Sequence, residues 1–240
     1  MMILKEKKVL TFDCYGTLID WETGIISYLG GVLRNHLVNI SDNEVLQLFG
    51  KTEHIVQDNH PDMIYLEVLR EVLKSVAKKY GFSPSNEELN SFCYSIQQWK
   101  PFLDTTSALK ILSTYFKLVI ISNIDNQSIS HSVQHMKVDF YKIFTAEMIG
   151  AYKPDHKVFR YALDQLEATD QFKMADVLHV AESIYHDHVP AREIGLDSIW
   201  INRRHSKSGY GATPQVNPDQ IPAQSFPTLM DFAHWVQKTY

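Results

Sequence analysis

Hydrophobic residues recur with two different periods, and the change of period divides the chain. A short β-prone run from Val9 to Phe12 ends abruptly at Asp13. From about Trp21 to Pro101 the spacing is helical, and apolar stripes of this kind pack helices against one another. The clearest stripes are Tyr65, Val68, Leu69, Val72, Leu73 and Val76, and then Leu89, Phe92, Cys93, Ile96 and Trp99. The pattern predicts one strand followed by a block of packed helices.

Local signals mark helix ends inside this block. Ser41 with Glu44, and Ser85 with Glu88, have the spacing of a capping box, in which each side chain satisfies the other's backbone N–H. Gly81 follows the first apolar stripe at a position suited to a helix C-terminus. We therefore expect separate helices with defined ends in this region.

The period changes again after Pro101. Three short, apolar, β-branched runs follow, separated by helical segments: 118–121, 177–180 and 198–201. Strands of this composition are typical of a parallel sheet with both faces covered by helices. The layout predicts an α/β fold, a doubly wound Rossmann-like parallel sheet core with an inserted helical cap domain. The predicted division is 1–19 and 102–240 for the core and 20–101 for the cap.

Composition narrows the class of protein. Of the 240 residues, 45% are hydrophobic and 21% charged, which is the balance of a globular protein. The formal net charge of −5 is not clustered, so we expect no nucleic-acid partner. No apolar run reaches the roughly 20 residues that span a bilayer, and we expect no membrane partner. Two distant cysteines and no signal-peptide pattern favour a cytoplasmic protein that acts on a small-molecule substrate, as a monomer or homodimer.

Polar side chains gather where the predicted strands end, which is where functional groups lie in doubly wound sheets. They are Asp13, Ser122, Asn123, Lys153, Glu182 and Asp187. Asp13 is an ionised carboxylate at neutral pH and a competent nucleophile when it is desolvated and aimed. Thr17 can hydrogen-bond that carboxylate and hold its rotamer.

The remaining polar residues suit supporting roles. Lys153 supplies a cation that would lower the pKa of Asp13 and keep it ionised. Asp187 would compensate Lys153, because an unpaired buried ion costs several kcal/mol. Ser122 and Asn123 offer neutral hydrogen-bond donors. We therefore take Asp13, Thr17, Ser122, Asn123, Lys153 and Asp187 as the candidate catalytic residues.

Four segments, in this order and at this spacing, resemble the motifs of the haloacid dehalogenase superfamily. They run from Phe12 to Leu18, Ile121 to Asn123, Tyr152 to Asp155 and Ala181 to Asp187. The helical insert also sits where that superfamily carries its first type of cap. The resemblance spans the whole chain and implies a hydrolase that forms a covalent intermediate on Asp13.

Within the superfamily, the chain resembles the 2-haloacid dehalogenases rather than the phosphatases. Family phosphatases carry an acidic residue two positions after the nucleophile, and here that position is Tyr15. The run from Asp13 to Ile25, with the segments at 123–125, 185–188, 203–205 and 209–213, is more similar still to azetidine-2-carboxylate hydrolases, which open a strained ring amine. We take Tyr15, Trp21, Glu182 and Tyr185 as the candidate substrate-binding residues.

Two departures affect the choice of substrate. Haloacid dehalogenases grip the substrate carboxylate with a cap arginine, and the segment 52–62 contains none. Asp13, Glu182 and Asp187 place three negative charges against Lys153 alone, a sum of −2. Such a pocket favours either a divalent metal or a cationic substrate group. We favour a protonated amine or imino acid, paired with Glu182, with no cofactor required.

Two alternatives stay open. The first is a magnesium-dependent small-molecule phosphatase, in which Asp13, the Tyr15 backbone, Glu182 and Asp187 would bind Mg²⁺. The second is a catalytically silent binding protein, because a fold by itself does not establish an activity.

Overall fold

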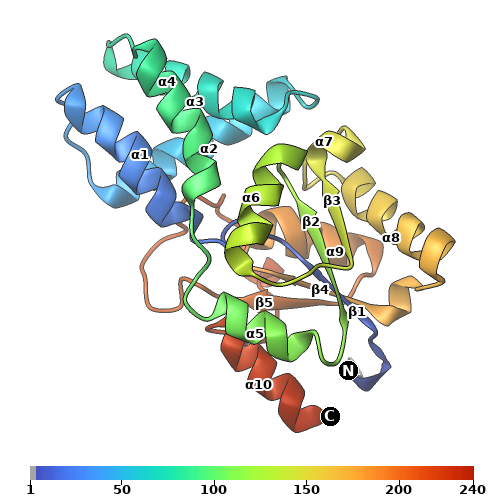
Figure 1. Ribbon diagram of the computed structural model, residues 1–240. Helices are drawn as coiled ribbons and strands as arrows, with labels where there is room; N and C mark the ends of the chain where they lie inside the picture. Colours follow the sequence, from blue (N-terminus) through green and yellow to red (C-terminus); the bar gives the residue numbers. More distant parts are fainter. Residues whose placement is uncertain (1–3) are drawn as a thin grey trace.

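The computed structural model describes residues 4–240 and contains one six-stranded parallel sheet (Figure 1). The strand order is β3-β2-β1-β4-β5-β6, and every neighbouring pair is parallel. The strands are β1 (Val9–Phe12), β2 (Lys117–Ser122), β3 (Lys142–Thr145), β4 (Val177–Ala181), β5 (Ser198–Ile201) and β6 (Ser225–Phe226). The order reverses direction at β1, which places β1 in the middle of the sheet. The predicted α/β, doubly wound core is confirmed.

Ten α-helices accompany the sheet within the described residues. They are α1 (Trp21–Asn35), α2 (Asp42–Asn59), α3 (Tyr65–Tyr80), α4 (Asn86–Ser95), α5 (Thr105–Leu112), α6 (Asn126–Met136), α7 (Ala146–Ile149), α8 (His156–Asp170), α9 (Val189–Ile194) and α10 (Leu229–Thr239). In Figure 1, α1 to α4 form a separate layer beyond one end of the sheet, and the later helices pack along the strands. The inserted helical cap is therefore present.

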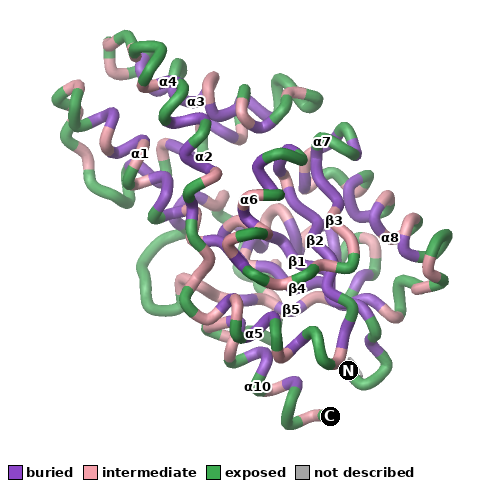
Figure 2. Tube along the Cα trace, viewed as in Figure 1, coloured by how far each residue is buried: buried purple, intermediate pink, exposed green. Residues whose placement is uncertain are grey.

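The alternation of side chains along the strands divides the core into two layers. Leu10 and Phe12 of β1 face a cluster that includes residues of α5, α6 and α10. Val9, on the opposite face, belongs to a second cluster with residues of α8 and α9. Figure 2 shows the central strands β1, β2 and β4 almost continuously buried, as a sheet covered on both faces requires.

The helix-end signals in the cap are confirmed. Both predicted capping boxes are present, at the start of α2 (Ser41 with Glu44) and of α4 (Ser85 with Glu88). Gly81 ends α3 with a left-handed φ of 75°. Every residue of the two predicted apolar stripes is buried. Leu89 to Cys93 lie within α4, whereas Ile96 and Trp99 lie just beyond it.

The chain crosses between core and cap through two adjacent segments. Asp20 N donates to Lys100 O at 2.8 Å, and Ile19 pairs with Pro101 in an antiparallel bridge. The cap is thus held at both ends of its sequence by neighbouring backbone. The division into 1–19, 20–101 and 102–240 stays a prediction.

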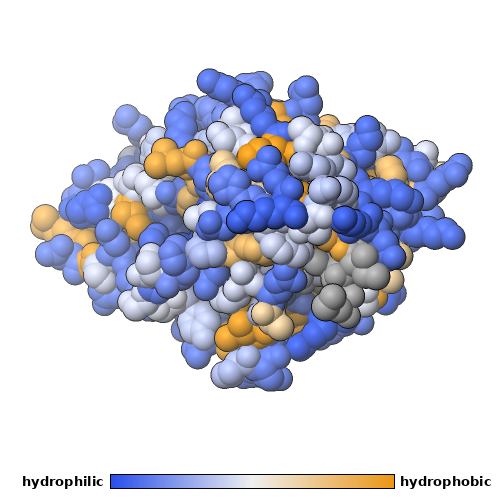
Figure 3. Space-filling view, turned by 90° about the horizontal axis from the view of Figure 1, so that it is seen from below, coloured by the Kyte–Doolittle hydropathy of each residue, from blue (hydrophilic) through white to orange (hydrophobic). Residues whose placement is uncertain are grey.

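The surface of the described residues is mostly polar. On the face seen in Figure 3, hydrophobic side chains form separate small patches among hydrophilic ones. None of the helices in residues 4–240 is long and apolar enough to cross a bilayer.

Candidate active site

The strand ends of the core and three helices of the cap, α1, α2 and α3, line one cavity. Because β1, β2 and β4 are neighbours in the sheet, the polar residues that follow them meet at one edge. The cavity is lined by Asp13, Tyr15, Trp21, Glu53, Gln57, Tyr65, Ser122, Asn123, Lys153, Glu182, Ser183, His186, Asp187 and Thr213. Most of the sequence-predicted residues are therefore brought together.

Asp13 is held through both carboxylate oxygens. Lys153 Nζ donates to Asp13 Oδ1 at 2.8 Å, and Thr17 Oγ1 donates to Asp13 Oδ2 at 2.6 Å. Thr17 Oγ1 also accepts from the backbone N–H of Glu182 at 2.8 Å, which ties the β1 loop to the β4 loop. These contacts fix the rotamer of a buried carboxylate, as the sequence predicted for Thr17.

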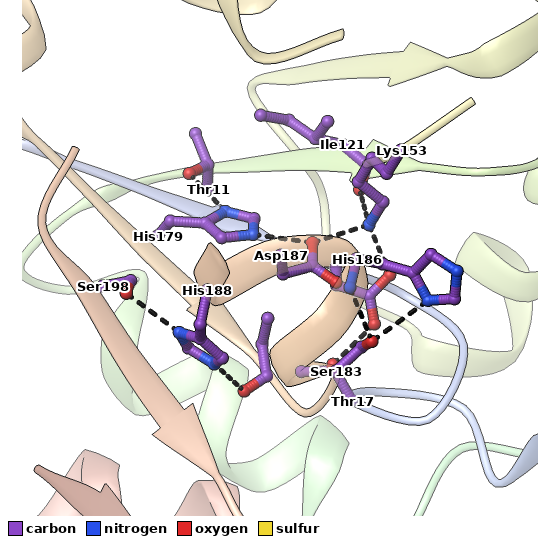
Figure 4. Close-up of polar contacts among 12 residues, drawn as sticks. Thr11, Thr17, Ile121, Lys153, His179, Ser183, His186, Asp187, His188 and Ser198 are labelled. Atoms are coloured by element: carbon purple, nitrogen blue, oxygen red, sulfur yellow. Dashed lines mark hydrogen bonds and ion pairs between the residues drawn. The ribbon is translucent and has the colours of Figure 1, made fainter. Parts of the chain in front are cut away.

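The Lys153 ammonium binds two carboxylates. Its Nζ lies 2.8 Å from Asp187 Oδ1 as well as from Asp13 Oδ1, and it donates to Ile121 O at 3.1 Å. In Figure 4, Lys153 and His179 approach the Asp187 carboxylate from opposite sides. Both acids and the lysine are buried, so the group is an ion network shielded from water.

The pKa values of Asp13 and Asp187 shift in opposite directions. Burial raises the pKa of Asp13, and repulsion by Asp187 adds to this, while Lys153 and Thr17 act in the opposite direction. Burial also acts to raise the pKa of Asp187, but Lys153 and His179 outweigh it and hold that pKa well below its usual range. Lys153 thus has the predicted effect on Asp13, but the predicted net lowering of the pKa is wrong because desolvation is larger.

Asn123 supports the lysine. Its Nδ2 donates to Lys153 O at 3.0 Å, and its Oδ1 accepts from Lys153 N at 2.7 Å. This pair of bonds holds the backbone from which the Lys153 side chain extends. The amide that the sequence suggested as a substrate donor is therefore engaged in positioning Lys153. Ser122, the last residue of β2, lines the cavity.

The aromatic candidates differ in their placement. Tyr15 lines the cavity, but its hydroxyl lies 2.7 Å from Ser132 Oγ, and burial raises its pKa well above the usual value. Trp21 lines the cavity as well. Tyr185 does not: its ring packs edge-on against His54 with a centroid distance of 5.6 Å. Its neighbour His186 lines the cavity instead, and the role of Tyr185 in substrate binding stays a prediction.

Glu182 lines the cavity as predicted, but its charge differs from the prediction. Burial raises its pKa to about 8, and the negative charges of Glu22 and Asp13 contribute. At pH 7 this carboxyl is largely protonated, so the pocket carries less negative charge than the predicted −2. The prediction failed because it counted formal charges without the cost of desolvation.

Sequence reasoning missed the polar residues that the cap contributes, namely Glu53, Gln57 and Tyr65. A signal was present, since Glu53 occupies a position in the buried face of α2 where Phe49 and Val56 mark an apolar stripe. A carboxylate in such a stripe indicates either a buried partner or a ligand. Tyr65 had been assigned to the hydrophobic core, yet its hydroxyl donates to Glu53 Oε1.

Sequence reasoning also missed Ser183, His186 and Thr213 on the core side of the cavity. Burial lowers the pKa of His186 to about 4, so its imidazole is neutral at pH 7. Within residues 4–240, Lys153 is the one lysine or arginine that lines the cavity.

The acids named for magnesium do not assemble into a metal site. Among residues 4–240, no three or more His, Cys, Asp or Glu side chains are grouped so that they could hold a metal ion. Asp13 and Asp187 each direct one oxygen at the Lys153 ammonium. The second oxygen of Asp187 is buried and has no hydrogen-bond partner among the described residues. The residues present thus do not fit the predicted magnesium set.

Comparison with known proteins defines the class. The family model described as haloacid dehalogenase-like hydrolase matches residues 10–201. This chain belongs to the haloacid dehalogenase-like hydrolase family, and it is an enzyme. The alternative of a catalytically silent binding protein is therefore set aside.

Individual relatives are distant but cover the chain almost completely. A curated (S)-2-haloacid dehalogenase from Pseudomonas sp. (strain CBS-3) is 21% identical over 214 residues, which are 87% of this chain and 90% of that protein. The structure of L-2-haloacid dehalogenase from Xanthobacter autotrophicus with chloropropionic acid covalently bound gives a TM-score of 0.77 at 18% identity, over 96% of this chain and 98% of that one. The structure of Bacillus subtilis YfnB bound to magnesium gives 0.74 at 18% identity, over 96% and 99%. At these identities the structures establish the fold alone.

Proposed function

We propose that this enzyme hydrolyses a small 2-substituted carboxylic or imino acid by nucleophilic displacement at carbon. One observation carries the proposal: Asp13 is fixed through both oxygens at the wall of a cavity whose one lysine or arginine within residues 4–240, Lys153, is already paired with Asp13 and Asp187. The related haloacid dehalogenases, one of them with chloropropionic acid covalently bound, support attack at the carbon next to a carboxylate.

The proposed reaction has two steps. An Asp13 oxygen attacks carbon 2 of the substrate, a C–O bond forms, and the bond from carbon 2 to the leaving group breaks with its electron pair. Water then adds to the aspartyl ester carbonyl, the 2-hydroxy acid departs, and the Asp13 carboxylate is restored with release of one proton. For a protonated cyclic imino acid, the leaving group is the ring nitrogen, which leaves as an amine and takes up that proton.

The electrostatics of the cavity favour the imino acid over the haloacid. Lys153 is already engaged by Asp13 and Asp187, so it offers little to a substrate carboxylate. Glu53 and Glu182 add two carboxyl groups to the lining. A leaving group that departs as an amine needs no cradle for a halide ion. Azetidine-2-carboxylate, with its strained ring, is the substrate we propose.

The phosphatase alternative is disfavoured by Tyr15. Its hydroxyl bonds Ser132, and its raised pKa makes it a poor proton donor to a leaving oxygen at neutral pH. The position two residues after Asp13 therefore holds a tyrosine where the family phosphatases carry a carboxylic acid.

An activity panel tests the proposal. L-azetidine-2-carboxylate, L-2-haloacids and a generic phosphomonoester should be compared with Mg²⁺ and with EDTA. We expect turnover of the imino acid in both conditions. Single-turnover reaction in ¹⁸O water should place the label in Asp13, as read by peptide mass spectrometry. Turnover restricted to the phosphomonoester, or label that enters only the product, would overturn the proposal.

A further inference from the structure

Two polar side chains of the cap reach the cavity from the same face of one helix. Glu53 and Gln57 lie four residues apart on α2, so their side chains neighbour one another at about 5–6 Å between Cβ atoms. Both residues are only 7% exposed, and both line the cavity that contains Asp13. Buried polar groups at such positions need a partner to offset their desolvation.

The Gln57 amide is free to bind a ligand. Among residues 4–240, no side-chain hydrogen bond joins it to another described group, and it is not one of the fully buried side-chain atoms that lack a partner. Its polar atoms are therefore accessible from the cavity that Gln57 lines, although the residue as a whole is only 7% exposed. Because the amide borders the cavity, a small ligand there can supply the missing hydrogen bonds.

Glu53 is oriented but not neutralised. The Tyr65 hydroxyl donates to its Oε1, which fixes the carboxyl group, and no cation pairs with it among the described residues. Burial raises the pKa of Glu53 to about 7, against which the hydrogen bond from Tyr65 acts in the opposite direction. A carboxyl group in this state gains most from a ligand that brings a positive charge.

We propose that Glu53 and Gln57 form the specificity-determining subsite of the cap for a zwitterionic 2-imino acid. Glu53 pairs with the cationic ring nitrogen, and the Gln57 amide donates to the substrate carboxylate. This inference rests on the proposed function, and it names the residues that select the substrate class.

The spacing of the two side chains matches the shape of such a ligand. An imino acid carries its nitrogen and its carboxylate on the same carbon, so an acid and an amide one helical turn apart can reach both. Lys153 cannot take the carboxylate without leaving Asp13 or Asp187. An anionic haloacid, by contrast, would meet Glu53 with a charge of the same sign.

Binding measurements on the inactive Asp13→Asn protein test the subsite without interference from turnover. The probe is L-azetidine-2-carboxylate, titrated by calorimetry at pH 7 in two buffers that differ in ionisation enthalpy. We expect the ligand to displace protons from Glu53, seen as a buffer-dependent heat. In the Glu53→Gln background this proton release should shrink, and the Kd should rise by roughly ten- to hundredfold.

Variants on the same helix provide matched controls. Asp58→Asn removes a charge from the exposed face of α2 and should leave the Kd unchanged. Gln57→Leu should weaken binding with no change in proton release, and Gln57→Glu should weaken it further by repelling the substrate carboxylate. Thermal melts check folding, and Glu53→Gln keeps an oxygen that can accept from Tyr65.

The two proposals fail in different ways. An unchanged Kd and unchanged proton release in Glu53→Gln overturn the subsite, even if ¹⁸O label enters Asp13. Absence of label in Asp13 overturns the reaction, even if the imino acid binds through Glu53. If Glu53→Gln does not fold, an unchanged Kd in Gln57→Leu and Gln57→Glu overturns the subsite instead.

Discussion

Asp13 and Asp187 bind the same ammonium group, and Lys153 Nζ lies 2.8 Å from Oδ1 of each. Asp187 Oδ1 also lies 2.9 Å from His179 Nε2, whose Nδ1 lies 2.9 Å from Thr11 Oγ1. The buried network therefore runs from the middle of the sheet, where Thr11 and His179 are paired on β1 and β4, to the nucleophile. Asp187 keeps the lysine in place, and the lysine keeps Asp13 in place.

This shared contact makes Lys153 and Asp187 one unit. Lys153→Met should depress kcat by about 10²–10³-fold, because it removes the cation that offsets developing negative charge. Asp187→Asn should also reduce kcat, and the double variant should lose less than the sum of the two single losses. Steady-state kinetics on all four proteins measure the coupling. Losses that simply add would show that the two residues act separately.

The nucleophile itself is tested by Asp13→Asn. A carboxamide is a far poorer nucleophile, so turnover should be abolished while the fold remains intact. Circular dichroism verifies the fold, and mass spectrometry of the same sample excludes deamidation back to aspartate. Activity within tenfold of the parent enzyme would remove Asp13 from this role.

The Glu182→Gln variant, together with EDTA, distinguishes a substrate that carries an ammonium group from a bound metal ion. At pH 9, where the Glu182 carboxyl is ionised, Glu182→Gln should raise KM for a cyclic imino acid by roughly ten- to hundredfold, since a hydrogen bond to a charged group contributes about 1.5–3 kcal/mol. EDTA should leave the wild-type enzyme unaffected. Loss of wild-type activity in EDTA, with recovery in Mg²⁺, would mean that the cation in this cavity is a metal ion.

The raised pKa values of Glu53 and Glu182, about 7 and about 8, predict a pH dependence. Each acid binds a cationic substrate only when it is ionised, so below pH 7 protons compete with the substrate. The wild-type KM for the imino acid should fall as the pH rises from 6 to 9. This fall should be smaller in Glu182→Gln, while a KM that is flat in the wild type would contradict the assignment.

The raised pKa of Glu53 also makes the stability of the fold depend on pH. A carboxyl group whose pKa is raised on folding binds more protons in the native state, so its contribution lowers stability as the pH rises above 4.5. For Glu53 the rise from 4.5 to about 7 corresponds to a cost on the order of 3 kcal/mol when fully ionised. Glu53→Gln should therefore raise the Tm relative to wild type at pH 9 and change it little at pH 4. An equal effect at both pH values would rule out this linkage.

The parts of the fold that follow from the sequence are those with strong local signals. The central strands are short apolar runs buried on both faces, and the capping boxes of α2 and α4 are local pairs. The edge strands β3 and β6 were not predicted. Residues of β3 are partly exposed at its start, and β6 has only two residues, so neither shows a continuous apolar run.

The residues of the candidate site likewise fall into those that the sequence predicts and those that it does not. Asp13, Ser122 and Asp187 could be predicted because parallel strands bring their ends to one edge. The apolar stripe of α2 marks Glu53 as an unusual buried carboxylate, but its place in this cavity, like that of Tyr65, could not be predicted, since the docking of the cap on the core depends on tertiary packing between distant segments. The pKa values of Asp13 and Glu182 also depend on burial, which a count of formal charges omits.

Two glycines of α1 give the last prediction. A Cβ at Gly24 would lie 2.3–2.6 Å from atoms of the Trp99 indole, whereas nothing lies within 4 Å of a Cβ at Gly31. Trp99 is buried and packs edge-on against Tyr15 of the cavity, with centroids 5.9 Å apart. Gly24→Ala should therefore destabilise the protein by about 1–3 kcal/mol through overpacking.

The matched change Gly31→Ala should stabilise the helix by roughly 0.5–1 kcal/mol, because alanine loses less backbone entropy than glycine. Because Trp99 has to move to admit a Cβ at position 24, Tyr15 should move with it. Gly24→Ala should then also raise KM, and Gly31→Ala should leave it unchanged. Denaturant unfolding and steady-state kinetics on both variants measure the two effects. Equal stability changes in the two proteins would show that the indole yields without cost, and an unchanged KM in Gly24→Ala would show that Tyr15 is held independently of Trp99.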